Sequence, residues 1–151
     1  MPYNVVCNMS TDNLSSGLED YIEAIYIAEL NKTQLKGAEL ARHLNISRAS
    51  VSEALSKLVS KGLIKYESYG AIMLTDAGKK SAVNVYHKHN VLKEFFETIL
   101  SAQPDEAEEI GCKIEHIVSK NVLEQMRQFT LYCKKHPDVI NNYTKEFCTI
   151  D

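Results

Sequence analysis

The stretch AELARHLNISRASVSEALSKLVSKG, residues 38–62, decides the fold of this chain. Apolar residues recur in its first part at helical spacing, as Ala38, Leu40, Ala41 and Leu44. This helix is predicted to stop at Asn45. Ser47 is then a typical N-cap for a second helix, and Gly62 stands where a helix ends in a left-handed residue. Two helices joined by the short turn LNIS predict a helix-turn-helix.

A short β-hairpin is predicted directly after the second helix. The β-prone runs LIKYE (63–67) and AIMLT (71–75) flank the turn residues SYG (68–70), and a helix-turn-helix followed by a hairpin is a winged helix. The second helix and the hairpin tip are predicted to contact DNA, because they carry side chains of types that reach phosphates and base edges. These residues are Ser47, Arg48, Ser50, Ser52, Glu53, Lys57 and Tyr69.

The charge distribution favours a nucleic-acid partner for this part of the chain alone. Residues 33–80 carry eight Lys and Arg against four Asp and Glu, whereas the whole chain has a net charge of -3. A basic segment in an acidic chain indicates where DNA would bind. Charge alone is equally compatible with lysines that only solvate a small domain, so the interpretation depends on charge and turn spacing together.

Most of the remaining chain is predicted to be helical. The expected helices cover residues 16–31, 76–100, a segment from Pro104 that carries residues 111–120, then 121–135 and 138–147. We therefore expect a mainly α protein with a winged-helix DNA-binding domain over residues 1–75 and an all-helical domain over residues 76–151. Residues 1–14 are polar and aperiodic, and we expect them to be flexible.

Composition argues against a membrane or a secreted protein. The chain has 151 residues, of which 44% are hydrophobic and 25% charged, and no apolar run approaches the roughly 20 residues that span a bilayer. Its N-terminus, MPYNVVCNMS, lacks the basic start and apolar stretch of a signal peptide. We expect a cytoplasmic protein.

The segment GCKIEHIVSK, residues 111–120, contains a candidate metal site. Cys112, Glu115 and His116 lie at positions i, i+3 and i+4 of a predicted helix, so their side chains share one face. A thiolate, a carboxylate and an imidazole suit a divalent transition ion such as iron, manganese, cobalt or zinc. A single inward cysteine or histidine is more often a core residue, so the spacing is the evidence for a site.

Three ligands do not fill a coordination sphere, and further candidates lie elsewhere in the sequence. Asp20 and Glu23 stand at i and i+3 beside the apolar stripe of the first helix, and His89 faces inward on the long helix. Acidic pairs of this kind are usually solvated, which is the alternative interpretation of Asp20 and Glu23.

The order of these motifs resembles a known family. LEDYIEAIYIAEL, the winged helix, VYHKHNVLKEFF and CKIEHIVS follow one another over residues 16–133 as in the metal-dependent repressors related to the diphtheria toxin repressor and the manganese repressor. The resemblance implies that the winged helix binds double-stranded operator DNA, that the helical domain binds metal and forms a homodimer, and that the metal acts as corepressor. It also implies that five residues at the ligand positions of the manganese-type pattern bind the metal: Asp20, Glu23, His89, Glu115 and His116.

Three residues make this chain a hybrid of the manganese-type and iron-type patterns, and one of them is Asp20, which stands where the iron-type member has methionine. Cys112 stands where manganese-type members have glutamate and iron-type members have cysteine, and Lys93 replaces an acidic ligand of the iron-type second site. The resemblance therefore implies a repressor controlling metal homeostasis with Mn²⁺ or Fe²⁺ as cofactor, for which Co²⁺ or Zn²⁺ can substitute. It leaves the number of metal ions open. A near-palindromic operator is expected for a dimer.

Two other function classes stay open at this point. One is a metal-independent winged-helix regulator of the multiple-antibiotic-resistance type, which responds to a small ligand or to oxidation of Cys112. The other is a small metalloenzyme, which has little support because the sequence contains no HExxH motif, nucleophile with a paired base, or glycine-rich phosphate loop. We therefore expect no enzymatic activity.

Overall fold

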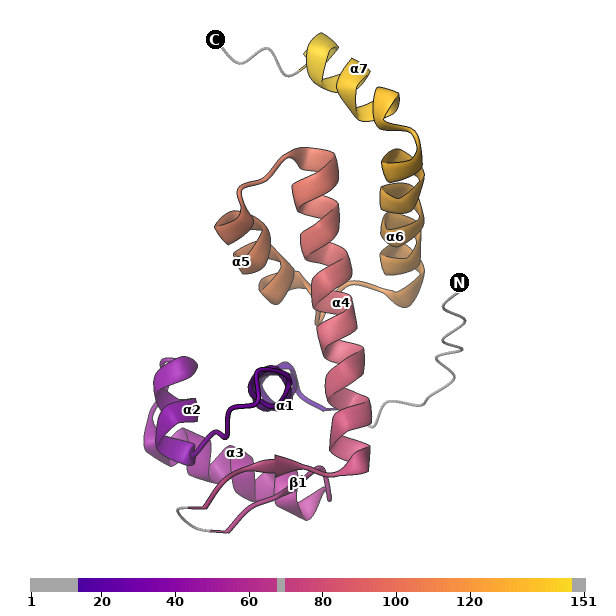
Figure 1. The fold of residues 1–151 in the computed structure, drawn as a ribbon. Coiled ribbons are helices and arrows are strands. Elements are labelled where there is room, and N and C mark those ends of the chain that lie inside the picture. The colour runs from indigo at the N-terminus through magenta and orange to yellow at the C-terminus, as the bar shows by residue number, and fades with distance from the viewer. Residues whose placement is uncertain (1–13, 68–69, 148–151) are drawn as a thin grey trace. The chain divides into compact units, whose positions relative to one another are not determined.

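The computed structural model describes residues 14–67 and 70–147, and its elements follow the sequence pattern closely (Figure 1). In chain order they are α1 (Ser16–Leu30), α2 (Gly37–His43), α3 (Arg48–Ser60), β1 (Ile64–Lys65), β2 (Met73–Leu74), α4 (Asp76–Leu100), α5 (Pro104–Ile114), α6 (Lys120–Lys135) and α7 (Pro137–Phe147). The mainly α class and the winged helix are confirmed.

The chain divides into two compact units, Met1–Val83 and Asn84–Asp151, and the long helix α4 runs from one into the other. The domain boundary predicted at residue 75 stays a prediction, as does the flexibility of residues 1–14, because residues 1–13 lie outside the described part of the chain. None of the helices within residues 14–67 and 70–147 is long and apolar enough to cross a membrane.

The N-terminal unit has a core made by three helices and the hairpin. Helices α1, α2 and α3 contact one another, and their fully buried side chains are Ile22, Ile25, Leu40, Val51, Leu55 and Leu58. The apolar stripes predicted from the sequence are therefore the faces that pack together.

The turn between α2 and α3 is built from local conformational preferences. Asn45 adopts a left-handed backbone conformation with φ 53°, which asparagine tolerates better than most residues. Ser47 is the N-cap of α3, and its hydroxyl oxygen accepts a hydrogen bond of 3.0 Å from Ser50 N–H. Gly62 follows α3 with φ 68°, as its position in the sequence predicted.

The wing is short, and residues of α1 and α4 hold it in place. Ile64 pairs with Leu74 in the antiparallel hairpin β1–β2, and the backbone N–H of Leu74 donates to Glu29 Oε1 on α1 at 3.0 Å. Gly78 in the first turn of α4 lies so close to Leu63 that an added Cβ would sit 1.9 Å from the Leu63 carbonyl oxygen. Nothing in the sequence indicated either contact, because both depend on how distant segments pack.

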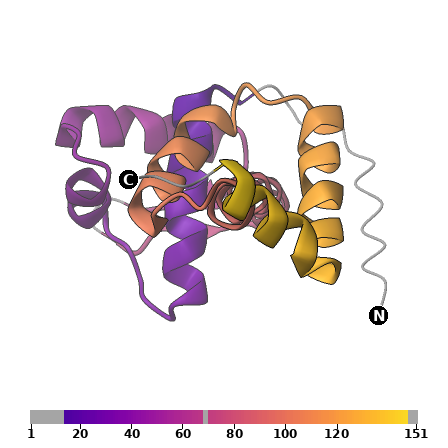
Figure 2. The same cartoon turned by 90° about the horizontal axis from the view of Figure 1, so that it is seen from above.

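The C-terminal unit is built around the second part of α4. Helices α5 and α6 lie on either side of it in both views (Figure 1 and Figure 2). Its buried apolar side chains come from α4 and from the two flanking helices: Val85, Val91, Leu92, Ile99, Ala107 and Cys133. Burial raises the pKa of the Cys133 thiol, as expected for a core residue.

One predicted element is wrong in its extent. The helix that starts at Pro104 ends at Ile114, so Glu115 is its C-cap and His116 lies in the turn beyond it. The backbone N–H groups of Ile117 and Val118 both donate to the Ile114 carbonyl at 3.0 Å, after which the chain turns to a new helix capped by Ser119. Cys112, Glu115 and His116 are therefore not all carried by one helix.

Candidate metal centre and DNA-binding surface

The predicted DNA-contacting residues of α3 are exposed. Ser47 at the N-cap and the five helix residues Arg48, Ser50, Ser52, Glu53 and Lys57 all face solvent. Tyr69, predicted at the wing tip, lies outside the described residues. Exposed hydroxyl, guanidinium and ammonium groups on one short helix are the donors expected at a DNA phosphate or base edge.

Glu53 and Lys57 interact with each other one helical turn apart. Lys57 Nζ donates to Glu53 Oε1 at 2.7 Å, and this hydrogen bond together with the lysine charge lowers the pKa of the Glu53 carboxyl. Both side chains are exposed, so the pair contributes little stability. The role of Lys57 at a DNA phosphate stays a prediction.

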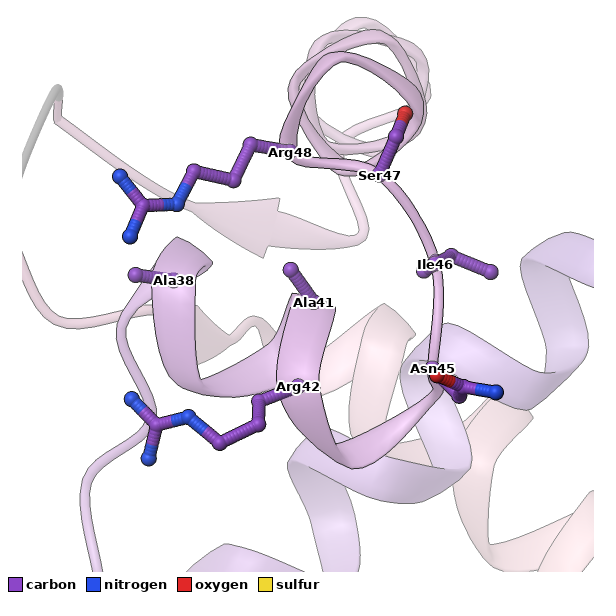
Figure 3. Close-up of a pocket in the computed structure, with 7 residues that line it drawn as sticks. All are labelled: Ala38, Ala41, Arg42, Asn45, Ile46, Ser47 and Arg48. Atoms are coloured by element: carbon purple, nitrogen blue, oxygen red, sulfur yellow. The ribbon is translucent and has the colours of Figure 1, made fainter.

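A second arginine, which the sequence interpretation did not single out, lies beside this helix. Arg42 of α2 and Arg48 of α3 line the same surface hollow together with Ala38, Ala41 and the turn residues 45–47. Both arginine side chains extend to the same side of the hollow, with Ala38 between them (Figure 3). Arg42 is exposed at the end of α2, and its position next to the turn was the signal in the sequence that could have identified it.

In the N-terminal unit, α1 carries the acidic pair predicted as metal ligands. Asp20 is partly buried and Glu23 is buried with 7% of its surface exposed. A carboxylate at this degree of burial is unusual. Removing a charged group from water costs about several kcal/mol, unless a nearby opposite charge or hydrogen bonds compensate for the lost hydration. The alternative of a solvated acidic pair therefore does not hold for Glu23.

In the C-terminal unit, Glu115 is the centre of a cluster with two histidines. Its carboxylate is fully buried, and Oε2 lies 2.9 Å from His89 Nδ1 on α4. His116 Nε2 lies 3.4 Å from Oε1 of the same carboxylate. Oε1 makes no hydrogen bond to any residue in the described part of the chain. The cluster therefore joins α4 to the end of α5 and leaves a buried carboxylate oxygen without a donor.

Glu108, which the sequence interpretation did not select, extends this cluster toward solvent. Glu108 Oε1 lies 3.1 Å from His89 Nε2, and Glu108 Oε2 accepts a hydrogen bond from Lys93 Nζ at 2.5 Å. The Lys93 hydrogen bond holds the pKa of the Glu108 carboxyl below its usual range, against the effect of burial, and the same bond raises the pKa of Lys93. Glu108 is one of several acidic residues at the start of α5, and nothing local distinguishes it from them.

Cys112 differs from these side chains in its exposure to solvent. Cys112 is exposed, whereas Glu115 is fully buried and His116 is largely buried. No cluster of three potential ligand atoms among residues 14–67 and 70–147 includes Cys112. Its role as a metal ligand stays a prediction.

The donor set of the C-terminal unit fits a divalent transition metal. Two imidazoles and one buried carboxylate are ligands that manganese, iron, cobalt and zinc accept. An unsatisfied oxygen on a buried carboxylate costs free energy, which a bound cation would offset. The second nitrogen of His89 contacts Glu108, the kind of outer partner that orients metal-binding histidines.

Family models match nearly the whole described chain. The DNA-binding domain of iron dependent repressors matches residues 13–72, and their metal binding and dimerisation domain matches residues 75–142. An HTH-type transcriptional regulator of Methanocaldococcus jannaschii is 36% identical over 117 residues, which cover 77% of this chain and 94% of the relative. The MntR transcriptional regulator of Lysinibacillus sphaericus is 27% identical and covers 82% of this chain and 88% of its own length.

Solved structures give the same fold assignment. The manganese regulator SloR shares 28% identity with a TM-score of 0.67, and the match covers 76% of this chain and 54% of SloR. A manganese-dependent transcriptional repressor in complex with manganese shares 26% identity with a TM-score of 0.70 over 75% of this chain and 52% of its own. This chain thus spans about half the length of these solved repressors.

Family membership decides between the function classes that the sequence left open. The matched domains are a DNA-binding domain and a metal-binding dimerisation domain, and they support DNA and a second copy of the chain as partners and a divalent metal as cofactor. A metal-independent regulator of the multiple-antibiotic-resistance type is not favoured. The chain belongs to the metal-dependent transcriptional repressors of the family of the diphtheria toxin repressor and MntR.

Proposed function

We propose that this protein is a repressor in which divalent metal, held by residues of both units, increases affinity for operator DNA. The observation that carries the proposal is the buried Glu115 carboxylate, which has a histidine nitrogen beside each oxygen and one oxygen without a hydrogen bond from the described residues. This arrangement is costly without a cation, and the family supplies the cation's role.

The proposed ligands come from two parts of the chain. His89, Glu115 and His116 belong to the C-terminal unit, whereas Asp20 and Glu23 belong to α1 of the DNA-binding unit. A bound divalent ion supplies positive charge that these carboxylates and imidazoles share. If ligands on both units bind the same metal, the metal-bound protein prefers one placement of the winged helix. Metal then shifts the population of molecules toward that placement, and the shift cannot exceed the difference in metal affinity between the placements.

In a dimer, the placement of the two winged helices determines whether both can bind the same DNA site. Two recognition helices read successive major grooves only when they are one helical turn apart, which is about 34 Å. Fixing each α3 relative to the dimerisation unit therefore raises affinity for a near-palindromic operator. Because its target is genomic DNA, we place the protein in the cytoplasm.

Manganese or iron is the proposed physiological metal. The acidic ligands Asp20, Glu23 and Glu115 suit manganese, whereas a thiolate from Cys112 would favour iron, cobalt or zinc. Two similar proteins of known structure, the manganese regulator SloR and a manganese-dependent transcriptional repressor, support manganese. Control of metal homeostasis is the function that such a sensor would serve.

The experiment measures operator affinity against metal. Apo protein prepared anaerobically is titrated with Mn²⁺, Fe²⁺, Co²⁺ or Zn²⁺ at fixed salt, and binding to DNA from upstream of its own locus is followed by fluorescence anisotropy. Metal is expected to raise affinity by roughly 5- to 150-fold, the usual range of coupling between sites. High affinity that is indifferent to every metal would refute the proposal.

A matched pair of variants on α1 tests the ligand assignment. Asp20→Ala is expected to remove the metal response, because it deletes a proposed ligand. Glu19→Ala removes the neighbouring carboxylate, which is not a proposed ligand, and is expected to keep the response. Equal responses of the two variants would contradict the assignment of Asp20.

A further inference from the structure

The wing is attached to α1 and to the loop after it through the backbone of β2. The Ile72 N–H, just before β2, donates to the carbonyl oxygen of Leu35 in that loop at 2.9 Å. The Leu74 N–H donates to Glu29 Oε1, near the end of α1, at 3.0 Å. The first acceptor is a backbone group, which any residue supplies. The second depends on the identity of residue 29.

Both oxygens of the Glu29 carboxylate contact neighbouring elements of the N-terminal unit. Oε1 accepts the Leu74 N–H of β2, and Oε2 lies 3.4 Å from Lys79 Nζ in the first turn of α4. The Glu29 side chain is 29% exposed, so water competes for these contacts only in part. A hydrogen bond to an ionised acceptor is about twice as strong as one between neutral groups. Glu29 therefore holds the wing against α1 more firmly than a neutral acceptor would.

The outward face of the wing carries a lysine whose position depends on β2. Lys65 of β1 pairs with Met73 of β2, and both side chains are exposed, whereas the next pair, Ile64 and Leu74, is buried. Strand β1 contacts α3, the helix predicted to read the major groove. An exposed ammonium beside this helix is suited to a phosphate of the adjoining DNA backbone.

We propose that Glu29 is a positioning residue for DNA binding: its carboxylate fixes the wing against α1 and thereby holds Lys65 at a DNA phosphate. Without the Glu29 acceptor, the Leu74 N–H has to bond to water, and the wing loses its side-chain attachment to α1. The inference rests on the proposed function for its operator DNA. It gives a role to a residue that is neither a predicted DNA contact nor a proposed metal ligand.

The charge of Glu29 separates this role from general electrostatics by the sign of the effect. Removing a carboxylate from a DNA-binding unit reduces repulsion of phosphates and frees Lys79, so charge alone predicts tighter DNA binding by Glu29→Ala. The positioning role predicts weaker binding, because Lys65 loses its fixed place. Glu29→Gln also removes the charge but keeps an oxygen that accepts the Leu74 N–H, so it is expected to bind at least as tightly as wild type.

The test is a double-mutant cycle between Glu29 and Lys65, measured as operator affinity of the full-length protein at saturating Mn²⁺ and several salt concentrations. Lys65→Ala alone is expected to weaken binding about 5-fold at about 0.15 M salt and to reduce the slope of log K against log salt by about 1, as loss of one phosphate contact does. Glu29→Ala is expected to weaken binding and to reduce the slope likewise. In the Glu29→Ala background, Lys65→Ala is expected to have no further effect.

Two outcomes of the cycle would overturn the inference. One is an unchanged affinity and salt slope in Lys65→Ala, which would exclude a phosphate contact at this residue. The other is an undiminished effect of Lys65→Ala in the Glu29→Ala background, because the two residues would then act independently.

Glu39→Ala is the matched control for Glu29→Ala. Glu39 Oε2 also accepts a backbone N–H in the same unit, that of Lys36 at 2.8 Å, but this contact stays within the start of α2. Lys65→Ala is expected to keep its full effect in the Glu39→Ala background. Loss of that effect would overturn the specific role of Glu29, since any weakened hydrogen bond in the unit would then suffice.

A further variant decides the inference if Glu29→Ala does not fold. Glu29→Asp retains the charge but shortens the side chain by a methylene group, so the carboxylate no longer reaches the Leu74 N–H. It is expected to weaken operator binding and to remove the effect of Lys65→Ala. Wild-type affinity in Glu29→Asp would overturn the inference.

Failure of the proposed function gives a different result. Wild-type operator affinity that is indifferent to Mn²⁺ would overturn metal activation. The comparison among variants at one Mn²⁺ concentration would still decide the role of Glu29.

Discussion

His116 follows the end of α5 by two residues, and its largely buried imidazole lies 3.4 Å from the Glu115 carboxylate. Its value to a metal site is therefore its proximity to Glu115 Oε1, a buried carboxylate oxygen that accepts no hydrogen bond from the described residues.

We expect His116→Ala to abolish the metal-stimulated part of DNA binding while leaving the fold intact. Loss of one proposed ligand should raise the Kd for Mn²⁺ by at least about 10-fold, since even outer partners contribute that much. His87→Ala, at an exposed position of α4, serves as the control. Mn²⁺ titration followed by DNA anisotropy distinguishes the two, and an unchanged metal response in His116→Ala would remove this residue from the site.

A glycine is required at position 78 because the backbone of Leu63 lies very close to it, not because its backbone conformation excludes other residues. A Cβ there would lie 1.9 Å from the Leu63 carbonyl oxygen, a backbone atom that itself accepts the Thr75 N–H at 3.0 Å and has little freedom to move. We expect Gly78→Ala to destabilise the protein by about 1–3 kcal/mol, the usual range for overpacking.

A second glycine provides the control. Gly17 in the first turn of α1 has no atom within 4 Å of its hypothetical Cβ, so Gly17→Ala is expected to be neutral or to stabilise by up to about 1 kcal/mol. Urea unfolding of both variants measures the difference. Equal free energies of unfolding for the two would contradict the proposed clash.

At the scale of the elements, the hollow between α2 and α3 is predicted to hold a DNA phosphate. Arg42 and Arg48 bring two guanidinium groups to it, and arginine favours such contacts because it presents a fork of N–H donors. Arg42→Ala is expected to weaken operator and non-specific DNA binding alike. It should also reduce the slope of log K against log salt by about 1.

Lys135→Ala is the control for this prediction. Lys135 is exposed at the end of α6 in the C-terminal unit. Its substitution by alanine removes one positive charge, as Arg42→Ala does, but leaves the winged helix unchanged. The measurement is DNA affinity at several salt concentrations for wild type and the two variants. An unaltered salt slope in Arg42→Ala would exclude a phosphate contact at this residue.

Helix α6 carries an ion-paired carboxylate whose effect on stability depends on pH. Arg127 donates to both oxygens of Glu124, at 2.8 and 2.7 Å, and with Gln128 it lowers the pKa of Glu124 from 4.5 to about 2. Because the pKa is lower in the folded than in the unfolded state, ionised Glu124 stabilises the folded protein above pH 4.5. This stability is lost as pH falls toward 2.

We expect Glu124→Gln to lower the free energy of unfolding near neutral pH, and the difference from wild type to shrink as pH falls from 4.5 toward 2. The Glu124 side chain is 45% exposed, so solvent screening limits the difference to less than about 1 kcal/mol. Urea unfolding of the apo proteins at pH 7 and at pH 2.5 measures it. A difference that is undiminished or larger at pH 2.5 would contradict the assignment.

At the scale of the whole molecule, metal activation is expected to depend on operator geometry. A dimer with two α3 helices fits half-sites that face the same side of the DNA, one turn or about 10 base pairs apart. Inserting five base pairs between the half-sites turns one of them to the opposite side of the duplex. We expect this insertion to reduce metal-dependent affinity to the level of non-specific binding.

The control for this prediction is a substitution of the same central base pairs without a change in length. It alters the sequence between the half-sites but keeps their spacing, and we expect it to preserve most of the metal-dependent affinity. Anisotropy titrations with saturating Mn²⁺ compare the three duplexes. Equal affinities for the original and the lengthened operator would contradict binding as a dimer with fixed recognition helices.

The elements of this protein are largely determined by its sequence, because they depend on interactions between near neighbours. Apolar periodicity defined α1 to α4, and the side chains of Ser47, Thr75 and Ser119 cap the helices that follow them. The acidic and histidine candidates came from their spacing on predicted helices and from the family resemblance, and they stay predictions as metal ligands. The predicted extent of the helix that carries Cys112 was wrong, because α5 ends at Ile114 before it reaches Glu115 and His116.

The tertiary structure alone decided which of several similar residues make contacts between distant segments of the chain. Glu108 looks like its acidic neighbours in α5 until α4 brings Lys93 and His89 against it, and these partners are 15 and 19 positions away in the chain. The same holds for Gly78 against Leu63 and for Arg42 beside Arg48. The physical reason is that helical periodicity fixes which face a residue occupies, whereas the axial register between packed helices, set by the whole core, fixes which side chain it meets.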